Sequence, residues 1–155
     1  MTLAIAGHGA TIDMELDPTL SPGVFTTIAE LQDISVPEMS RGETEVTAHD
    51  KTMDEWVLST RVLRSPLSGT VNFVHDNGTH DHLTGLRYAL LNGEVRGYRI
   101  VGPNSTGAGD HEWIGSGEVQ AFGPVTYPVR EGVVQANFAI RLSGPMKIDG
   151  VLFGV

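Results

Sequence analysis

Residues 134–142 read VQANFAIRL, the longest regular alternation in the chain. Apolar side chains recur there at every second position: Val134, Ala136, Phe138, Ile140 and Leu142. Because successive side chains of a β-strand point to opposite faces of the sheet, this period of two predicts a strand with one buried face.

Shorter alternations of the same kind occur elsewhere in the chain. They predict strands around residues 12–16, 71–73 and 98–100, and weaker patterns predict strands within 24–36, 42–48 and 112–122. Glycine accounts for 19 of the 155 residues and is spread singly between these patterns, which indicates frequent turns. We therefore expect about six to eight antiparallel strands.

Two segments depart from this alternation and predict helix. Leu83, Leu86 and Leu90 recur at helical spacing within residues 79–92, and Gly93 follows, where a helix end favours glycine. Residues 52–55 read TMDE, the spacing of a capping box, and predict a short helix through Trp56 and Leu58. The resulting prediction is a mainly β fold: an antiparallel β-sandwich or partly closed barrel with one flanking α-helix at 79–92.

The length and composition narrow the class of protein. A chain of 155 residues fits one domain, residues 1–155. The absence of cysteine excludes disulfide scaffolds, thiol nucleophiles and cysteine metal sites. Since the sequence has no apolar run long enough to cross a bilayer and no leader-like amino terminus, we expect neither membrane insertion nor export.

The net charge of −9 is unevenly distributed. Residues 1–60 contain eleven of the 19 acidic residues but only Arg41 and Lys51 among the bases, whereas the charges of the remaining residues balance. The simplest interpretation of this excess is a solubilising surface. Because Lys and Arg provide sequence-independent affinity for nucleic acid, such a chain should repel phosphate backbones.

One group of polar residues has side chains of the kinds that bind metal. It consists of His75, Asp76, His80, Asp81 and His82. However, positions 80 and 82 of the predicted helix point in different directions, so the spacing does not favour a metal site. No motif of an activated nucleophile accompanies the cluster. We predict that the chain is not an enzyme and uses neither a cofactor nor a metal.

Several segments follow one another along the chain in an order that resembles a known protein family. The segments are IAELQDIS at 28–35, VTAHD at 46–50 followed by Trp56, SGTVNF at 68–73, LLNGE at 90–94, YRIV at 98–101, and the predicted strands 113–122 and 133–143 followed by Gly144-Pro145. In order and spacing, they resemble the major tail tube proteins of long, noncontractile-tailed (siphovirus-type) bacteriophages. The resemblance covers about residues 10–145.

This resemblance implies a fold, an assembly and a location. The implied protomer is a β-sandwich with a flanking helix, related in fold to secretion-system tube proteins. Hexameric rings of such protomers stack into a hollow tube around a tape-measure protein, between tail-tip and tail-terminator proteins. Viral DNA passes through the tube without specific binding. The implied location is the virion tail, assembled in the host cytoplasm, and no catalysis is implied.

The resemblance also suggests roles for particular residues. Because an acidic wall repels DNA, we expect Asp33, Glu38, Glu43 and Glu45 to include residues of the lumen or the ring junctions. We expect residues 38–51 to form an inter-ring loop and residues 1–10 a flexible arm. Candidate contacts between subunits are Met39, Arg41, His49, Lys51 and Trp56. The apolar segment 144–155 either closes the protomer's own core or docks on a neighbour.

Two rival interpretations remain open at this stage. A small β-sandwich carbohydrate-binding module could use the loop GPNSTGAGD at 102–110, and a metal-assisted hydrolase could use the histidine cluster. A tube subunit predicts rings or tubules that form as concentration rises. A carbohydrate module instead predicts saturable sugar binding by a monomer, and a hydrolase predicts activity that a chelator abolishes.

Overall fold

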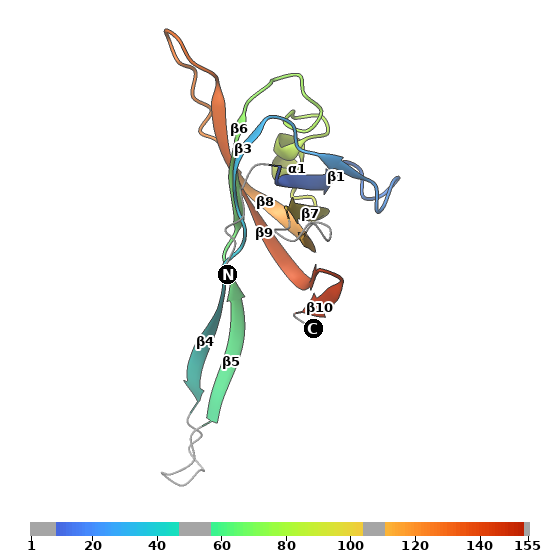
Figure 1. The fold of residues 1–155 in the computed structure, drawn as a ribbon, viewed down its shortest axis with the longest axis vertical. Coiled ribbons are helices and arrows are strands. Elements are labelled where there is room, and N and C mark those ends of the chain that lie inside the picture. The colour runs from blue at the N-terminus through green and yellow to red at the C-terminus, as the bar shows by residue number, and fades with distance from the viewer. Residues whose placement is uncertain (1–8, 47–56, 104–110, 154–155) are drawn as a thin grey trace, which may run out of the picture.

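The computed structural model describes residues 9–46, 57–103 and 111–153, and shows a curled antiparallel sheet with one helix and a projecting hairpin (Figure 1). The strands are β1 (Thr11–Glu15), β2 (Phe25–Thr27), β3 (Leu31–Ser35), β4 (Met39–Val46), β5 (Val57–Arg64), β6 (Leu67–Asn72), β7 (Arg96–Gly102), β8 (His111–Phe122), β9 (Gln135–Ile148) and β10 (Val151–Phe153). The helix is α1 (Leu86–Asn92).

Eight of the strands form one antiparallel sheet, in the order β2-β1-β7-β8-β9-β6-β3, with β10 paired to the end of β9. The central strand β9 contains most of the alternation at 134–142 and pairs with both β6 and β8. Ala136, Phe138, Ile140 and Leu142 are buried, while Gln135, Asn137 and Arg141 between them are exposed. The predicted strand with one buried face is therefore confirmed.

The hydrophobic core lies on one face of this sheet. It consists of Ile12, Met14, Ile28, Leu67, Val71, Phe73, Tyr98, Ile100, Val119, Ala136, Phe138, Ile140, Leu142 and Met146, with Leu86 and Ala89 from α1. The helix packs against β8, and the sheet curls around the core so that β1 and β3 also touch. The prediction of a mainly β fold with a partly closed barrel and one helix is confirmed.

Residues 28–30 join the two outermost strands of the sheet. The segment 24–36, where a weak pattern predicted strand, contains two strands, β2 and β3. They are separate because the chain turns at Ala29 and Glu30, and Glu30 adopts a φ of 55°. Four Cα steps from Thr27 to Leu31 span at most about 15 Å. The two ends of the sheet must therefore approach one another at this point, which curls the sheet.

Two side chains from residues 79–80 hold this turn. The Ala29 backbone N–H donates to Thr79 Oγ1 (3.1 Å), and the Ala29 carbonyl accepts a hydrogen bond from His80 Nε2 (2.8 Å). The other ring nitrogen of His80, Nδ1, accepts from the Val74 backbone N–H (3.2 Å). Because one ring nitrogen donates and the other accepts, the fully buried His80 imidazole is neutral in this arrangement.

The helix is shorter than predicted and begins at Leu86 rather than near residue 79. The Asp81 carboxylate accepts hydrogen bonds from the backbone N–H groups of Leu83 (3.2 Å), Thr84 (2.8 Å) and Gly85 (2.9 Å), so residues 81–85 form a turn. Burial alone would raise the pKa of Asp81, but these hydrogen bonds hold it below its ordinary value. The predicted carboxy-terminal end of the helix is confirmed. Gly93 has a left-handed conformation, and its backbone N–H donates a hydrogen bond to carbonyl groups of the last helical turn.

Strands β4 and β5 form a separate two-stranded hairpin, here called the arm, which extends away from the body (Figure 1). The part of the expected loop 38–51 that the structure describes is mostly strand, since Met39 to Val46 pair with Arg64 to Val57. Leu58 belongs to β5, so the predicted short helix does not reach it. Residues 52–56 of that prediction, including Trp56, lie outside the described residues.

The carboxy-terminal segment returns to its own sheet. Asp149 and Gly150 have φ angles of 48° and 84°, a pair that suits the tight turn joining β9 to β10. Met146 is buried in the core, whereas Val151 and Leu152 remain exposed. Met146 therefore packs in the protomer's own core, whereas docking on a neighbour stays a prediction for the exposed Val151 and Leu152. The expected flexible arm, residues 1–10, falls outside the described residues apart from Gly9 and Ala10.

His80→Ala should destabilise the protein because the substitution leaves a cavity and deprives the Ala29 carbonyl and the Val74 N–H of their partner. We expect the free energy of unfolding, measured by urea denaturation, to fall by about 3 kcal/mol. The matched control His82→Ala removes an exposed imidazole and should change it by less than about 0.5 kcal/mol. Equal midpoints for the His80 variant and the wild type would contradict this account of the turn.

The β9–β10 turn should respond to acid through Asp149. Its carboxylate accepts hydrogen bonds from the Glu112 N–H (2.8 Å) and from His111 Nδ1 (2.9 Å), which lower the pKa of Asp149 below the ordinary 3.8. This stabilising contribution is therefore present above the ordinary pKa and is lost as pH falls through the lowered one. An NMR titration should show the carboxyl group protonating below 3.8; protonation at or above that value would contradict the bonding described.

Candidate assembly surfaces

One face of the sheet has no other element packed on it in the described part of the chain, and it is polar. We define this polar face by outward polar residues of β3, β6, β8 and β9, all exposed or half-buried: Asp33, Ser35, Ser68, Thr70, Ser116, Glu118, Gln120, Asn137, Arg141 and Ser143. Ala121 and Ala139 lie on the same face. Figure 1 shows β3 and β6 edge-on. In this view α1 and β1 lie on one side of these strands, and the polar face is on the other side.

The residues of the polar face lie in rows across neighbouring strands. Asp33, Thr70 and Asn137 occupy paired positions on β3, β6 and β9, and Thr70 Oγ1 donates to Asn137 Oδ1 (2.9 Å). Glu118 and Arg141 face one another across β8 and β9. Most of the side chains are short and uncharged, and the charges are two carboxylates and one guanidinium. The face is therefore hydrophilic and slightly acidic.

Both edges of the eight-stranded sheet are open within the described residues, because no strand pairs with the outer side of β2 or of β3. Such an edge presents unpaired backbone N–H and C=O groups that can pair with a strand of another chain. Near the β2 edge, Asp13 is buried and accepts hydrogen bonds from Arg99 (2.6 Å and 2.9 Å) and Thr27 (2.7 Å). These hydrogen bonds join β2, β1 and β7 through their side chains, so they hold the edge strand β2 in place on the sheet.

The four predicted acidic residues are distributed between the body and the arm. Asp33 is exposed on the polar face, and Glu38 is exposed where β3 leads into the arm. The Glu38 backbone is fixed to Ser65, with its N–H donating to Ser65 Oγ (2.7 Å) and its carbonyl accepting from the Ser65 N–H (2.9 Å). Glu43 and Glu45 lie in β4, opposite Thr60 and Leu58. The structure therefore does not bring all four together.

Two of the predicted contact residues, Met39 and Arg41, lie on the arm. Met39 begins β4 and is half-exposed, and Arg41 pairs with Val62. His49, Lys51 and Trp56 lie outside the described residues. Their proposed role in subunit contacts stays a prediction.

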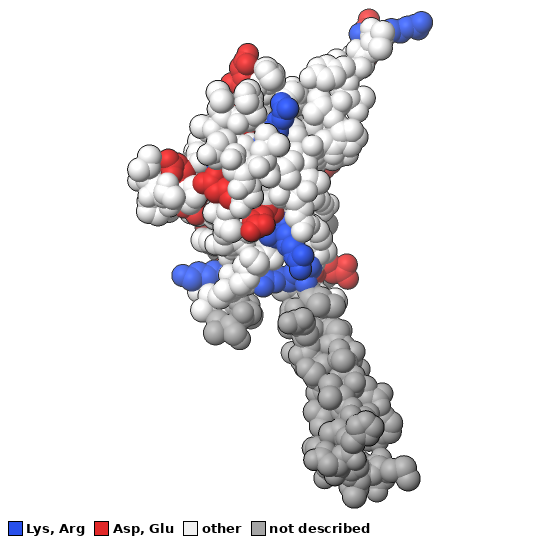
Figure 2. All heavy atoms as spheres, turned by 180° about the vertical axis from the view of Figure 1, so that it is seen from behind, with Lys and Arg blue, Asp and Glu red and all other residues white. Residues whose placement is uncertain are grey.

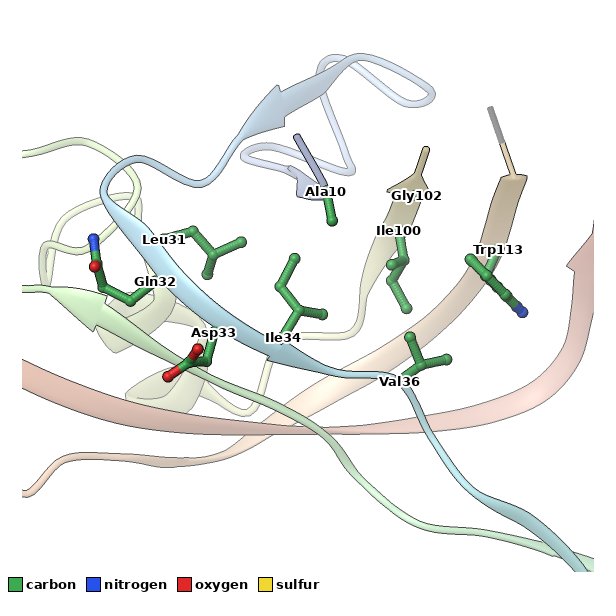
Figure 3. A pocket seen from close by; sticks show the side chains of 9 residues that line it. All are labelled: Ala10, Leu31, Gln32, Asp33, Ile34, Val36, Ile100, Gly102 and Trp113. Carbon is green, nitrogen blue, oxygen red and sulfur yellow. The ribbon is translucent and has the colours of Figure 1, made fainter. Parts of the chain in front are cut away.

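A pocket of about 490 Å³ opens where β3 passes into the arm (Figure 3). Its walls are mainly apolar: Ala10, Leu31, Ile34, Val36, Ile100, Gly102 and Trp113, with Gln32 and Asp33 as the polar members. We call this cavity the arm-root pocket. This pocket cannot be predicted from the sequence, because it is formed by β3, the end of β7 and the start of β8, which are far apart in the chain.

Among the described residues, the histidines and acids invoked for a metal-assisted hydrolase do not assemble into a site. His80 is buried in the turn described above, while the exposed rings of His75 and His82 stack at a centroid distance of 6.1 Å. Among the residues that the structure describes, no three histidine or acidic side chains are grouped so that they could hold a metal ion. Residues 104–110 of the proposed sugar-binding loop are outside the described part. No helix within that part could span a membrane.

Comparison with known proteins finds similarity of fold. No protein-family model matches the chain, and no curated protein matches its sequence. A chain of the sixfold-symmetrised anti-feeding prophage baseplate aligns with a TM-score of 0.67 at 12% identity, covering 97% of this chain and 98% of its own length. A chain from the tail of an empty gene transfer agent particle, with C6 symmetry, gives 0.63 at 20% identity, covering 93% and 98%.

A chain of the SPP1 tail tube gives a TM-score of 0.63 at 14% identity, covering 96% of this chain and 80% of its own length. The similarity in each case includes almost the whole of the present chain rather than a shared fragment. The resemblance to tail tube proteins inferred from the order of segments is thus confirmed at the level of the fold.

Proposed function

We propose that this chain is a structural subunit of a phage-type tail tube, in which six copies form a ring and the rings stack into a hollow tube. The observation that carries the proposal is a curled sheet whose polar face is uncovered and whose two edges are unpaired within the described residues. The full-length fold similarity to chains of tails and baseplates supports it, as does the sixfold symmetry of two of those assemblies.

In the proposed ring, the β2 edge of one subunit meets the β3 edge of the next. Pairing of these strands would join the sheets into a continuous barrel and satisfy the backbone groups that each edge leaves open. A contact between different surfaces of two copies closes into a ring when the rotation from one copy to the next divides a full turn evenly, as the proposed sixfold ring requires. The polar face then lines the bore.

A bore of this composition suits the passage of DNA. Phosphate backbones bind where Lys and Arg displace counterions, and the polar face offers Arg141 alone, opposite the carboxylate of Glu118. Asp33 and Glu118 give the wall a net negative charge, which repels DNA and prevents it from adhering. Glu38, Glu43 and Glu45 would extend this charge toward the ring junctions.

The arm is the natural connection between rings, because it extends from the body along the longest axis of the molecule (Figure 1). Met39, Arg41, His49, Lys51 and Trp56 would provide its contacts with a neighbouring ring. In a complete tail, the tube would enclose a tape-measure protein and end at tail-tip and terminator proteins. The proposed location is the virion tail, after assembly in the host cytoplasm, and the role is structural and does not involve catalysis.

Assembly of the purified chain tests this proposal. With rising concentration, negative-stain electron microscopy should show rings and then tubes, with six subunits in end-on class averages. A variant in which a short Gly-Ser turn replaces residues 39–64 should retain the folded body but form at most rings. A wild-type chain that remains monomeric at every concentration, even with a tail-tip initiator, would contradict the proposal, and saturable sugar binding by that monomer would favour the rival module.

A further inference from the structure

Residues 123–134, which connect β8 to β9, form a projection that we call the finger. It extends from the body in the direction opposite to the arm (Figure 1). Its base is fixed by hydrogen bonds from the Gly123 N–H to the Asn137 carbonyl (2.6 Å) and from the Thr126 N–H to the Gln135 carbonyl (3.0 Å). Beyond that base it exposes three large apolar side chains: Tyr127 by 67%, Val129 by 98% and Val133 by 61%.

Apolar side chains concentrated on a projecting segment favour contact with another surface, since exposing them to water is unfavourable. The arm-root pocket provides such a surface. Leu31, Ile34 and Val36 form one wall, and Ile100 and Trp113 form the other (Figure 3). Val36 is itself 42% exposed at the pocket.

The finger and the pocket lie at opposite ends of the same strand. Trp113, near the start of β8, borders the pocket, whereas Phe122 at the end of β8 leads directly into the finger. Nine residues of extended strand separate them by about 30 Å. The finger also extends away from the body, in the direction opposite to the arm (Figure 1). Its tip therefore does not reach the pocket of its own chain, and contact between the two requires a second copy.

We propose that the finger of one copy docks in the arm-root pocket of a second copy, with Tyr127 and Val129 against the apolar walls. The second copy is a subunit of the next ring, an assignment that rests on the proposed function. Because the contact joins two different surfaces at opposite ends of the molecule, it repeats without closing and builds a linear stack.

Charged residues flank the apolar side chains of the finger. Arg130 and Glu131 follow Val129 in the sequence, and Figure 2 shows basic and acidic side chains at the end of this projection. Asp33 is among the nine residues that line the pocket, but its carboxylate points to the polar face, on the other side of β3 from Ile34 (Figure 3). The apolar side chains, rather than an ion pair, would therefore carry the contact.

Cross-linking tests the proposal without background, because the natural chain has no cysteine. Single variants Val129→Cys and Val36→Cys are mixed under tube-forming conditions and treated with a short bismaleimide. We expect a mixed dimer from this pair and little product when Leu20→Cys, a more exposed position in the β1–β2 turn, replaces Val36→Cys. The double variant Val129→Cys/Val36→Cys should give a ladder of covalent multimers, since each copy offers one end to each neighbour.

The outcomes separate this inference from the proposed function. Wild-type tubes in which Val129→Cys does not cross-link to Val36→Cys would overturn the docking of the finger while leaving the tube intact. Dimers formed by Val129→Cys alone would show that fingers meet fingers, and would overturn it as well. If wild-type tubes do not form at all, the proposed function fails, whatever the cross-links show.

Discussion

The short connection between opposite edges of the sheet is the constraint on which the rest of the structure depends. Residues 28–30 lead from β2 at one edge to β3 at the other, so the strands between them must curve until these edges approach. The turn is held from a distance in sequence, by Thr79 and His80, whose side chains bond both polar groups of Ala29. A flat sheet of this strand order would need a far longer connection.

Because the sheet is curved, one of its faces is buried and the other is exposed. The concave face encloses the side chains of Phe138, Ile140 and their neighbours, together with α1, and this burial is the main source of stability. The convex face carries short polar residues and remains uncovered, and the edges of the sheet remain open in the described part. A protein that buries only one side of an incomplete barrel is suited to assembly with its own copies, and the finger, arm and arm-root pocket provide further surfaces at its ends.

The sequence predicts what depends on local pattern and misses what depends on distant contacts. The strict alternation at 134–142 identifies β9, and Gly93 identifies the end of α1, because both signals lie within a few adjacent residues. The predicted start of α1 is too early because Leu83 continues the helical spacing, whereas the Asp81 carboxylate accepts three backbone N–H hydrogen bonds that hold residues 81–85 in a turn. The break in 24–36 depends on His80, fifty residues away. Of the polar face, Asp33 was anticipated by resemblance, whereas Glu118 and Arg141 face one another only because β8 pairs with β9.

The central claim is that the convex, polar face of the sheet lines the bore of a tube made of this chain. A helical reconstruction of assembled tubes, at a resolution that shows side chains, measures this orientation directly. The account predicts Thr70, Asn137 and Arg141 on the inner wall, with β2 of each subunit paired to β3 of the next. It is contradicted if those three residues lie on the outer surface of the tube, or if the polar face is buried between subunits.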